Sequence, residues 1–122
     1  MAEFAGLRVL LVEDEGGVAL LLEDMLEDLG CRIAASVARL SRAVAAVQAE
    51  PPDLAVLDVN VAGETSFAFA RALMDRGIPV IFSTGYGNGG LPADLRDRPV
   101  LTKPFTQADL NEAITAALGQ RA

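Results

Sequence analysis

Short apolar runs alternate with helical patterns along this chain, and that alternation narrows its possible folds more than any other feature. Runs of strand length lie at about 8–12, 31–36, 54–57, 79–83 and 99–102. Between them, apolar residues recur at the spacing of one helix face. Strands that alternate with helices are joined by right-handed crossovers and form a parallel sheet covered on both faces. The pattern therefore predicts an α/β fold with a doubly wound five-stranded parallel sheet.

The helices are expected after each of the first three strands and after the last. Their apolar faces are predicted to be Val18, Leu21, Leu22, Met25, Leu26 and Leu29; Leu40, Val44 and Val47; Phe69, Ala70, Leu73 and Met74; and Leu110, Ile114, Ala117 and Leu118. A capping box over 106–109 opens the last helix. After the fourth strand, the glycine-rich stretch 85–90 leaves room for at most a short helix over 91–96. The flavodoxin-like strand order 2-1-3-4-5 suits so short a chain.

Size and charge limit the classes of function. A chain of 122 residues with 52% hydrophobic residues predicts one domain over 1–122. The net charge of −7, from 10 basic and 17 acidic residues, argues against a nucleic-acid-binding surface. A lone cysteine, Cys31, excludes an internal disulfide and suits a buried position. No apolar stretch has the length of a membrane span or of a leader peptide, so we expect a soluble, cytoplasmic protein without membrane partners.

Polar residues end four of the apolar runs. Glu13 and Asp14 follow the first, Asp58 the third, Thr84 the fourth and Lys103 the fifth. The carboxyl ends of parallel strands meet at one edge of the sheet, so these side chains should lie together. Clustered carboxylates with an ammonium suit Mg2+ and a phosphoryl group. Asp58 is placed as a nucleophile that forms an acyl phosphate, and Thr84 could hydrogen-bond the new group.

These residues closely resemble the receiver domains of response regulators in two-component signalling, the CheY-like domains, over nearly the whole chain. The segments that carry the resemblance are Val9-Leu10-Leu11-Val12-Glu13-Asp14-Glu15, Leu57-Asp58-Val59-Asn60, Thr84-Gly85 and Lys103-Pro104-Phe105. The resemblance implies that Asp58 is the phosphoacceptor and that Thr84 and Lys103 assist it. It also implies a cis peptide bond before Pro104.

The resemblance also implies a Mg2+ site and a set of partners. Asp14 and Asp58 would bind the ion through their carboxylates, Glu13 through water, and Asn60 through its backbone carbonyl. Gly85, Tyr86 and Pro104 would modulate the site. The phosphoryl group would come from a histidine kinase, a histidine phosphotransfer protein or a small donor, since the chain has no histidine of its own. Output would go through a downstream protein target or through use as a phosphate sink.

One subgroup is matched more closely, and two features depart from the wider family. Phe82-Ser83-Thr84-Gly85-Tyr86 resembles atypical stand-alone receivers named for a Phe-x-Thr-Gly-Tyr (FATGUY) stretch. Val100 stands where the family often has a switching aromatic residue, and the fourth helix is shortened or irregular. We therefore expect the loop over 86–90 to carry the conformational change, with Tyr86 as its lever.

Three other functions fit parts of the sequence. The glycines of 85–90 satisfy a dinucleotide-binding pattern, but Pro92 interrupts the helix that such a site needs. Asp58-Val59-Asn60 is similar to the Asp-x-Asp motif of aspartyl-phosphate phosphatases, but Asn60 cannot serve as the general acid. We therefore expect no separate substrate turnover. A docking module without phosphorylation would not need this set of acidic, hydroxyl and ammonium groups.

Overall fold

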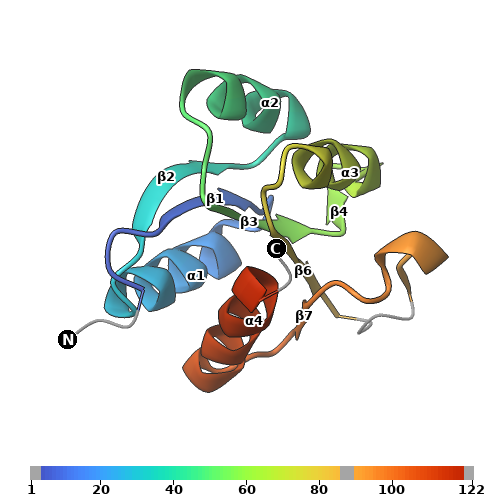
Figure 1. Ribbon diagram of the computed structural model, residues 1–122. Coiled ribbons are helices and arrows are strands. Elements are labelled where there is room, and N and C mark those ends of the chain that lie inside the picture. Colours follow the sequence, from blue (N-terminus) through green and yellow to red (C-terminus); the bar gives the residue numbers. More distant parts are fainter. Residues whose placement is uncertain (1–3, 86–89, 120–122) are drawn as a thin grey trace.

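The computed structural model describes residues 4–85 and 90–119 and folds them into one five-stranded parallel sheet between helices (Figure 1). Its elements are β1 (Arg8–Val12), α1 (Gly16–Asp28), β2 (Arg32–Val37), α2 (Leu40–Ala49), β3 (Leu54–Asp58), β4 (Asn60–Val61), β5 (Glu64–Thr65), α3 (Phe67–Asp75), β6 (Val80–Thr84), η2 (Ala93–Leu95), β7 (Val100–Thr102) and α4 (Gln107–Gly119). The strand order is β2-β1-β3-β6-β7, with every pair parallel. The predicted flavodoxin-like fold and strand order are confirmed.

Two hydrophobic cores lie on the two faces of the sheet, because successive strand side chains point to opposite sides. On one face, Val9, Leu11 and Val56 pack with α1 and α4. On the other, Leu10 and Phe82 pack with α2, α3 and the segment around η2. Figure 1 shows α1 and α4 on one side of the sheet and α2 and α3 on the other. Both faces are covered, which explains the unbroken apolar runs of the central strands.

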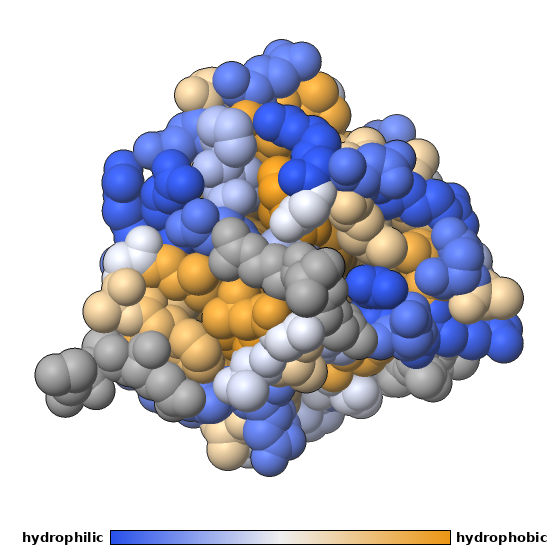
Figure 2. All heavy atoms as spheres, viewed as in Figure 1, coloured by the Kyte–Doolittle hydropathy of each residue, from blue (hydrophilic) through white to orange (hydrophobic). Residues whose placement is uncertain are grey.

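The helix faces differ from the prediction at two positions. Leu21 is 47% exposed and Val44 is 45% exposed, although both were expected in the core. On α2 the buried positions are Ala43 and Val47. The apolar stripe of each helix is wider than the surface it buries, so residues at its margin stay in contact with solvent. Figure 2 shows hydrophobic atoms gathered on the side of the molecule where α1 lies, and mainly hydrophilic atoms around α2.

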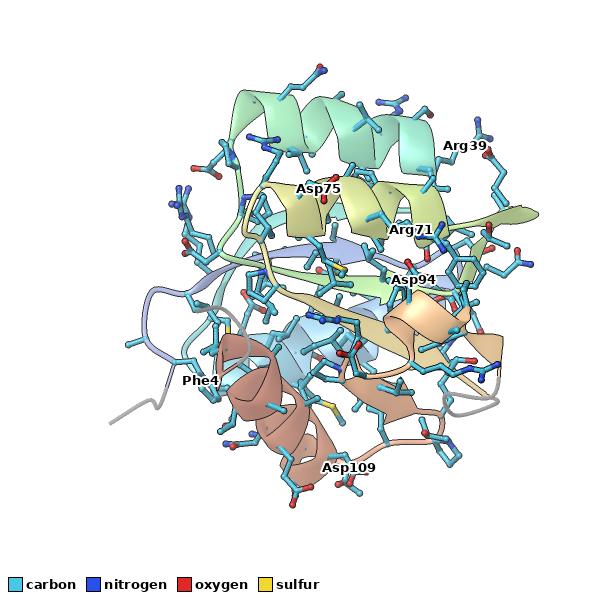
Figure 3. The ribbon with its side chains drawn as sticks, turned by 45° about the vertical axis from the view of Figure 1, so that its right-hand side comes forward. Phe4, Arg39, Arg71, Asp75, Asp94 and Asp109 are labelled. Atoms are coloured by element: carbon cyan, nitrogen blue, oxygen red, sulfur yellow. The ribbon has the colours of Figure 1, made fainter. Side chains whose placement is uncertain are left out.

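In place of a full fourth helix, the described part of the segment between β6 and β7 contains the short 3-10 helix η2, as expected. Leu91 and Leu95 are buried against the sheet and hold this segment on the core. Arg71 of α3 donates to the Asp94 carboxylate at 2.8 Å and 3.0 Å, so an exposed two-point ion pair joins η2 to α3 (Figure 3). Tyr86, the expected lever, lies outside the described residues.

The last helix opens as its sequence predicts. The Thr106 N–H donates to Asp109 Oδ2 at 2.8 Å, and the Asp109 N–H donates to Thr106 Oγ1 at 3.1 Å. This reciprocal capping box ties down the first turn of α4. In the part of the chain that the structure describes, no helix has both the length and the hydropathy needed to cross a bilayer.

A short antiparallel hairpin follows β3 and was not predicted. β4 pairs with β5, with Asn60 opposite Thr65 and Val61 opposite Glu64. Each strand has only two residues, which is too short for a periodic pattern to reveal. The hairpin lies directly after Asp58, so it belongs to the surroundings of the functional site.

Candidate functional site

The carboxyl ends of four adjacent strands bring together the polar residues picked out in the sequence. Val12 lies beside Leu57 in the β1–β3 pair, so Glu13 and Asp14 emerge next to Asp58. Asp58 in turn lies beside Ser83 of β6, and Thr84 lies beside Thr102, the residue before Lys103. The convergence predicted from the strand ends is therefore confirmed.

Three carboxylates form a compact cluster at this edge. Glu13, Asp14 and Asp58 each offer one carboxylate oxygen, and these oxygens lie within 4.8 Å of one another. Only 1% of the Glu13 side chain and 13% of the Asp58 side chain is exposed, whereas Asp14 is exposed. Oxygen ligands crowded at such distances suit a small hard cation, and the exposed Asp14 leaves a side open to water or phosphate oxygens.

The side-chain ammonium of Lys103 lies beside the carboxylate cluster. Its Nζ lies 3.0 Å from Glu13 Oε1 and 3.5 Å from Asp58 Oδ2, and its backbone N–H donates to the Thr84 carbonyl at 2.9 Å. Lys103 therefore lies closer to Glu13 than to Asp58, the residue that it is expected to assist. The Lys103–Pro104 peptide bond is cis, in agreement with the expectation from the resemblance.

The electrostatics of the site follow from this crowding. Burial and the neighbouring Glu13 carboxylate raise the pKa of Asp58 to about 6, against the opposing effect of Lys103. Partial burial disfavours the Lys103 ammonium, but its hydrogen bond to Glu13 and the negative charge of Asp58 together raise the pKa of Lys103. At neutral pH, Asp58 is therefore mostly ionised and Lys103 fully charged, so this edge of the sheet presents an anionic oxygen beside an ammonium.

The loop after Asp58 is held by residues that the sequence analysis did not single out. The Ser66 hydroxyl, fully buried, donates to the Asp58 carbonyl at 2.6 Å, and the Ser66 N–H donates to the Val59 carbonyl at 2.9 Å. At the hairpin tip, the N–H of Ala62, a residue with a φ of 51°, donates to Asp14 Oδ2 at 2.8 Å. In the sequence, Ser66 stands directly before an apolar helix. That position predicts a helix cap and gives no indication that the serine bonds to the carbonyl at the end of a strand.

The remaining predicted residues have distinct positions. Thr84 is buried at the end of β6, with 4% of its surface exposed, and Gly85 directly after it is exposed. Asn60 opens β4, two residues after Asp58, with its side chain exposed. Pro104 is exposed beside Lys103. In the chain, these residues lie at or next to the strand ends that carry Asp58, Thr84 and Lys103, whereas Tyr86 lies outside the described residues.

A family comparison decides what kind of domain this is. Residues 9–115 match the family model of the response regulator receiver domain. The chain belongs to this family. Receiver domains bind Mg2+ at an acidic pocket and interact with kinases or phosphotransfer proteins, and the cluster of Glu13, Asp14 and Asp58 lies where such a pocket is expected.

The relatives and solved structures agree with this assignment. SdrG from Sphingomonas melonis Fr1 is 41% identical, with a TM-score of 0.84 over 93% of this chain and 97% of SdrG. The receiver domain of PhyR from Erythrobacter litoralis is 32% identical, with a TM-score of 0.81 over 95% of this chain and 92% of that domain. The phyllosphere-induced regulator PhyR of Methylorubrum extorquens is 31% identical over 91% of this chain. This receiver spans less than half of the length of the curated relatives it matches, 43% in the case of that PhyR.

Proposed function

We propose that this receiver accepts a phosphoryl group on Asp58 in a two-component phosphorelay and acts as a response regulator of the stand-alone type. The observation that carries the proposal is the position of the Asp58 carboxylate, between Glu13 and Asp14 on one side and Lys103 on the other. The similarity to SdrG extends to a structure described as its BeF3-activated conformation, which is 41% identical with a TM-score of 0.81. A BeF3 group bound to a carboxylate oxygen has the tetrahedral shape of an attached phosphoryl group, so the likeness supports the same chemistry here.

In the proposed step, an Asp58 carboxylate oxygen attacks the phosphorus of the donor. A new O–P bond forms, and the P–N bond of a phosphohistidine or the P–O bond of a small donor breaks, with its electron pair leaving on the donor. The Lys103 ammonium is 3.5 Å from Asp58 Oδ2, close enough to neutralise charge on the transferred group. The Ser66 hydroxyl and N–H hold the Asp58 and Val59 carbonyls, so the acceptor keeps its direction.

The donor set fits Mg2+. Glu13, Asp14 and Asp58 would hold the ion, with the Asn60 carbonyl as a further ligand. When bound, Mg2+ neutralises the carboxylates and the oxygens of the phosphoryl group. The three acidic residues and one lysine carry a surplus of negative charge at neutral pH, which gives the metal-free site a reason to bind a cation.

Thr84 is proposed to hydrogen-bond the phosphoryl group and pass the change to the chain that follows β6. Gly85, Tyr86 and Pro104 are proposed to modulate this response, and the Phe-x-Thr-Gly-Tyr stretch supports the proposal that the chain is a FATGUY-type receiver. Val100 is only half-buried and small, which leaves the loop over 86–90 to carry the change. Output then goes to a downstream protein target or through use as a phosphate sink. Turnover of a separate substrate is not proposed, because Asn60 offers no general acid, and a cytoplasmic location stays a prediction.

Incubation with acetyl phosphate tests this function. With Mg2+ present, intact-mass analysis should find one phosphoryl group on the wild-type protein. With Mg2+ removed by EDTA, the gain should fall to background, because the surplus negative charge then repels the donor. Equal labelling with and without the metal would contradict the role of the acidic cluster, and no labelling by either acetyl phosphate or a phosphohistidine donor would contradict the function itself.

The donor protein is proposed to dock on an apolar hollow beside the acceptor. This hollow, of about 320 Å3, is lined by Val18, Leu21, Lys103, Pro104 and Phe105. Lys103 belongs both to the hollow and to the acceptor site, so a protein seated here reaches Asp58. The exposure of Leu21, at 47%, fits a contact that is completed by a partner.

Leu21→Lys should therefore slow phosphotransfer from a phosphorylated histidine phosphotransfer protein by about tenfold or more, because the variant loses one leucine contact that the docked donor would bury. Transfer from acetyl phosphate should be unchanged, since the small donor needs no docking surface. Val44→Lys on α2 is the matched control, because Val44 is 45% exposed and lies on the other face of the sheet. An equal loss in both variants, or none in Leu21→Lys, would exclude the hollow as the docking site.

A further inference from the structure

The edge strand β7 directs unpaired main-chain groups away from the sheet. The Phe82 N–H donates to the Pro99 carbonyl at 3.0 Å, and the Lys103 N–H donates to the Thr84 carbonyl at 2.9 Å. Every second residue of a parallel strand bonds to the same neighbour, so the main chains of Val100 and Thr102 face outward. β7 is the last strand of the sheet, and within the described ranges no other element pairs with it. Two N–H and two C=O groups are thus available at this edge.

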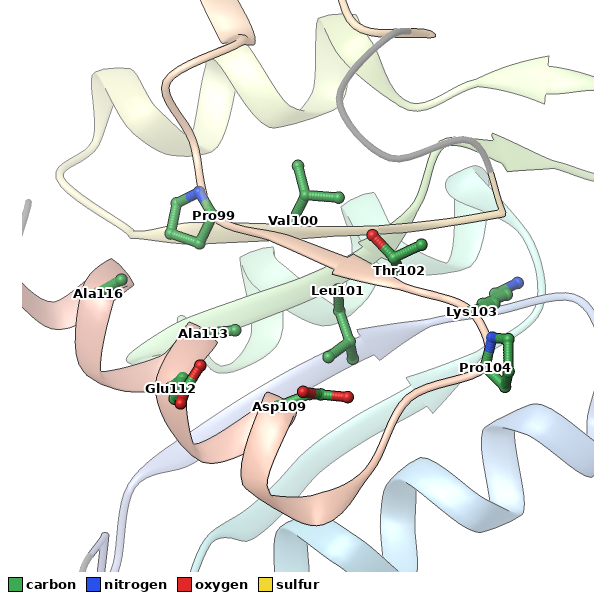
Figure 4. Close-up of a pocket in the computed structure, with 10 residues that line it drawn as sticks. All are labelled: Pro99, Val100, Leu101, Thr102, Lys103, Pro104, Asp109, Glu112, Ala113 and Ala116. Atoms are coloured by element: carbon green, nitrogen blue, oxygen red, sulfur yellow. The ribbon is translucent and has the colours of Figure 1, made fainter.

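A groove runs along this edge. It has a volume of about 500 Å3 and lies between β7 and one side of α4 (Figure 4). The small side chains of Ala113 and Ala116 on α4 leave the space beside the strand open. Between β6 and β7, the described residues contain the short 3-10 helix η2 in place of a full helix.

The rim of the groove is acidic. Asp109 and Glu112 of α4 line it, both exposed, and the chain carries a net charge of −7. Lys103 also lines the groove, but its ammonium is paired with Glu13 and Asp58. A segment that enters the groove therefore meets two exposed carboxylates on the α4 side, Glu112 and Asp109, of which Asp109 also accepts the Thr106 N–H. On the β7 side it meets main-chain hydrogen-bonding groups.

We propose that the β7 edge binds an extended basic segment of a partner protein, which adds a sixth strand to the sheet. Side chains of a strand alternate between faces, so lysines or arginines at every second position would face Asp109 and Glu112. A second copy of this chain is a poorer occupant, because two copies would bring their acidic rims and their −7 charges together. Pro99 and Pro104 flank β7 and confine the added strand to a short segment.

A synthetic peptide tests the edge directly on the unphosphorylated full chain, so the result does not depend on the proposed phosphorylation. The probe is a hexapeptide of alternating lysine and valine, compared with the same peptide carrying glutamate for lysine and with one N-methylated at alternate main-chain amides. Amide NMR shifts and hydrogen exchange are followed at Val100 and Thr102. The lysine peptide should slow exchange of both amides, and the other two peptides should not.

Charge-reversal variants check the acidic rim. Glu112→Lys should weaken binding of the lysine peptide about fivefold, the size of one exposed charge pair. Asp75→Lys is the matched control, because Asp75 is an exposed acidic residue on α3, on the opposite face of the sheet (Figure 3). Absence of binding at millimolar peptide, binding without protection of Val100 and Thr102, or protection that grows with protein concentration alone would overturn the proposal. The last of these would identify a second copy as the occupant.

Discussion

Asp58→Asn is expected to leave the protein unable to take up a phosphoryl group from any donor, while its fold stays intact. The amide that replaces the carboxylate offers no anionic oxygen to attack phosphorus. Glu13 cannot substitute, because it is buried and held by Lys103 at 3.0 Å. Intact-mass analysis after acetyl phosphate treatment measures the effect, and the β-sheet signal in circular dichroism serves as the control. Labelling of the variant at the wild-type level would refute the role of Asp58.

The same substitution should stabilise the metal-free protein at neutral pH. Burial and Glu13 raise the pKa of Asp58 from 3.8 to about 6, so the folded state holds this proton more tightly than the unfolded state. The wild-type free energy of unfolding should fall as pH rises from 4 to 6, and the loss should persist at pH 7. With allowance for solvent screening at a partly exposed site, the loss is about 1–2 kcal/mol. The free energy of unfolding of Asp58→Asn should not fall in this way between pH 4 and pH 6.

Lys103→Ala is expected to destabilise the metal-free protein more than any other substitution at the site. Glu13 is almost completely buried, and the Lys103 ammonium is the cation that lies against it. Removing one partner of a buried ion pair leaves a buried charge without compensation, at a cost of about 3–5 kcal/mol. Because 24% of the Lys103 side chain is exposed and Asp58 can take up a proton, we expect a cost below this range, about 2–3 kcal/mol.

Two comparisons separate this effect from a loss of packing. Mg2+ should restore more stability to Lys103→Ala than to the wild type, because the ion replaces the missing positive charge. The double variant Glu13→Gln, Lys103→Ala should recover most of the loss without metal. Chemical denaturation at pH 7 gives all of these free energies. If the double variant were as unstable as Lys103→Ala, the cost would come from packing of the lysine stem instead.

Lys103→Ala should also accept the phosphoryl group slowly and transmit the change poorly. Asp58 keeps its nucleophilic oxygen, so labelling by acetyl phosphate with Mg2+ should persist at a reduced rate. The phosphorylated group then lacks the ammonium that would draw it toward β7, so a downstream target should bind the variant more weakly. Full target binding by the phosphorylated variant would restrict Lys103 to a structural role.

The arrangement of the sheet and most of the site could be predicted because both depend on local patterns. Four of the five apolar runs of strand length ended in a distinct polar residue, and the parallel strand order then brings Asp58 next to Asp14 and Lys103. The shortened fourth helix followed from its glycines and from Pro92.

The features that could not be predicted from the sequence depend on how distant parts of the chain pack together. The closer partner of Lys103 is Glu13 rather than Asp58, a choice set by the depth at which each carboxylate is buried. The bond from Ser66 to the Asp58 carbonyl joins residues eight positions apart through an irregular hairpin, which no periodicity encodes. Leu21 lies at the margin of the buried face of α1, whose buried residues are Leu22 and Leu26, and the pattern of a single helix cannot show how far its neighbours cover that margin.

The most direct test is to locate the phosphoryl group on the chain. Wild-type protein labelled with acetyl phosphate and Mg2+ is treated with borohydride, which reduces an acyl phosphate to an alcohol at the modified residue, and the peptides are sequenced by mass spectrometry. Reduction at Asp58 alone is the predicted result. Reduction at Asp14 or Glu13, or a borohydride-resistant phosphate on Thr84, would contradict Asp58 as the acceptor.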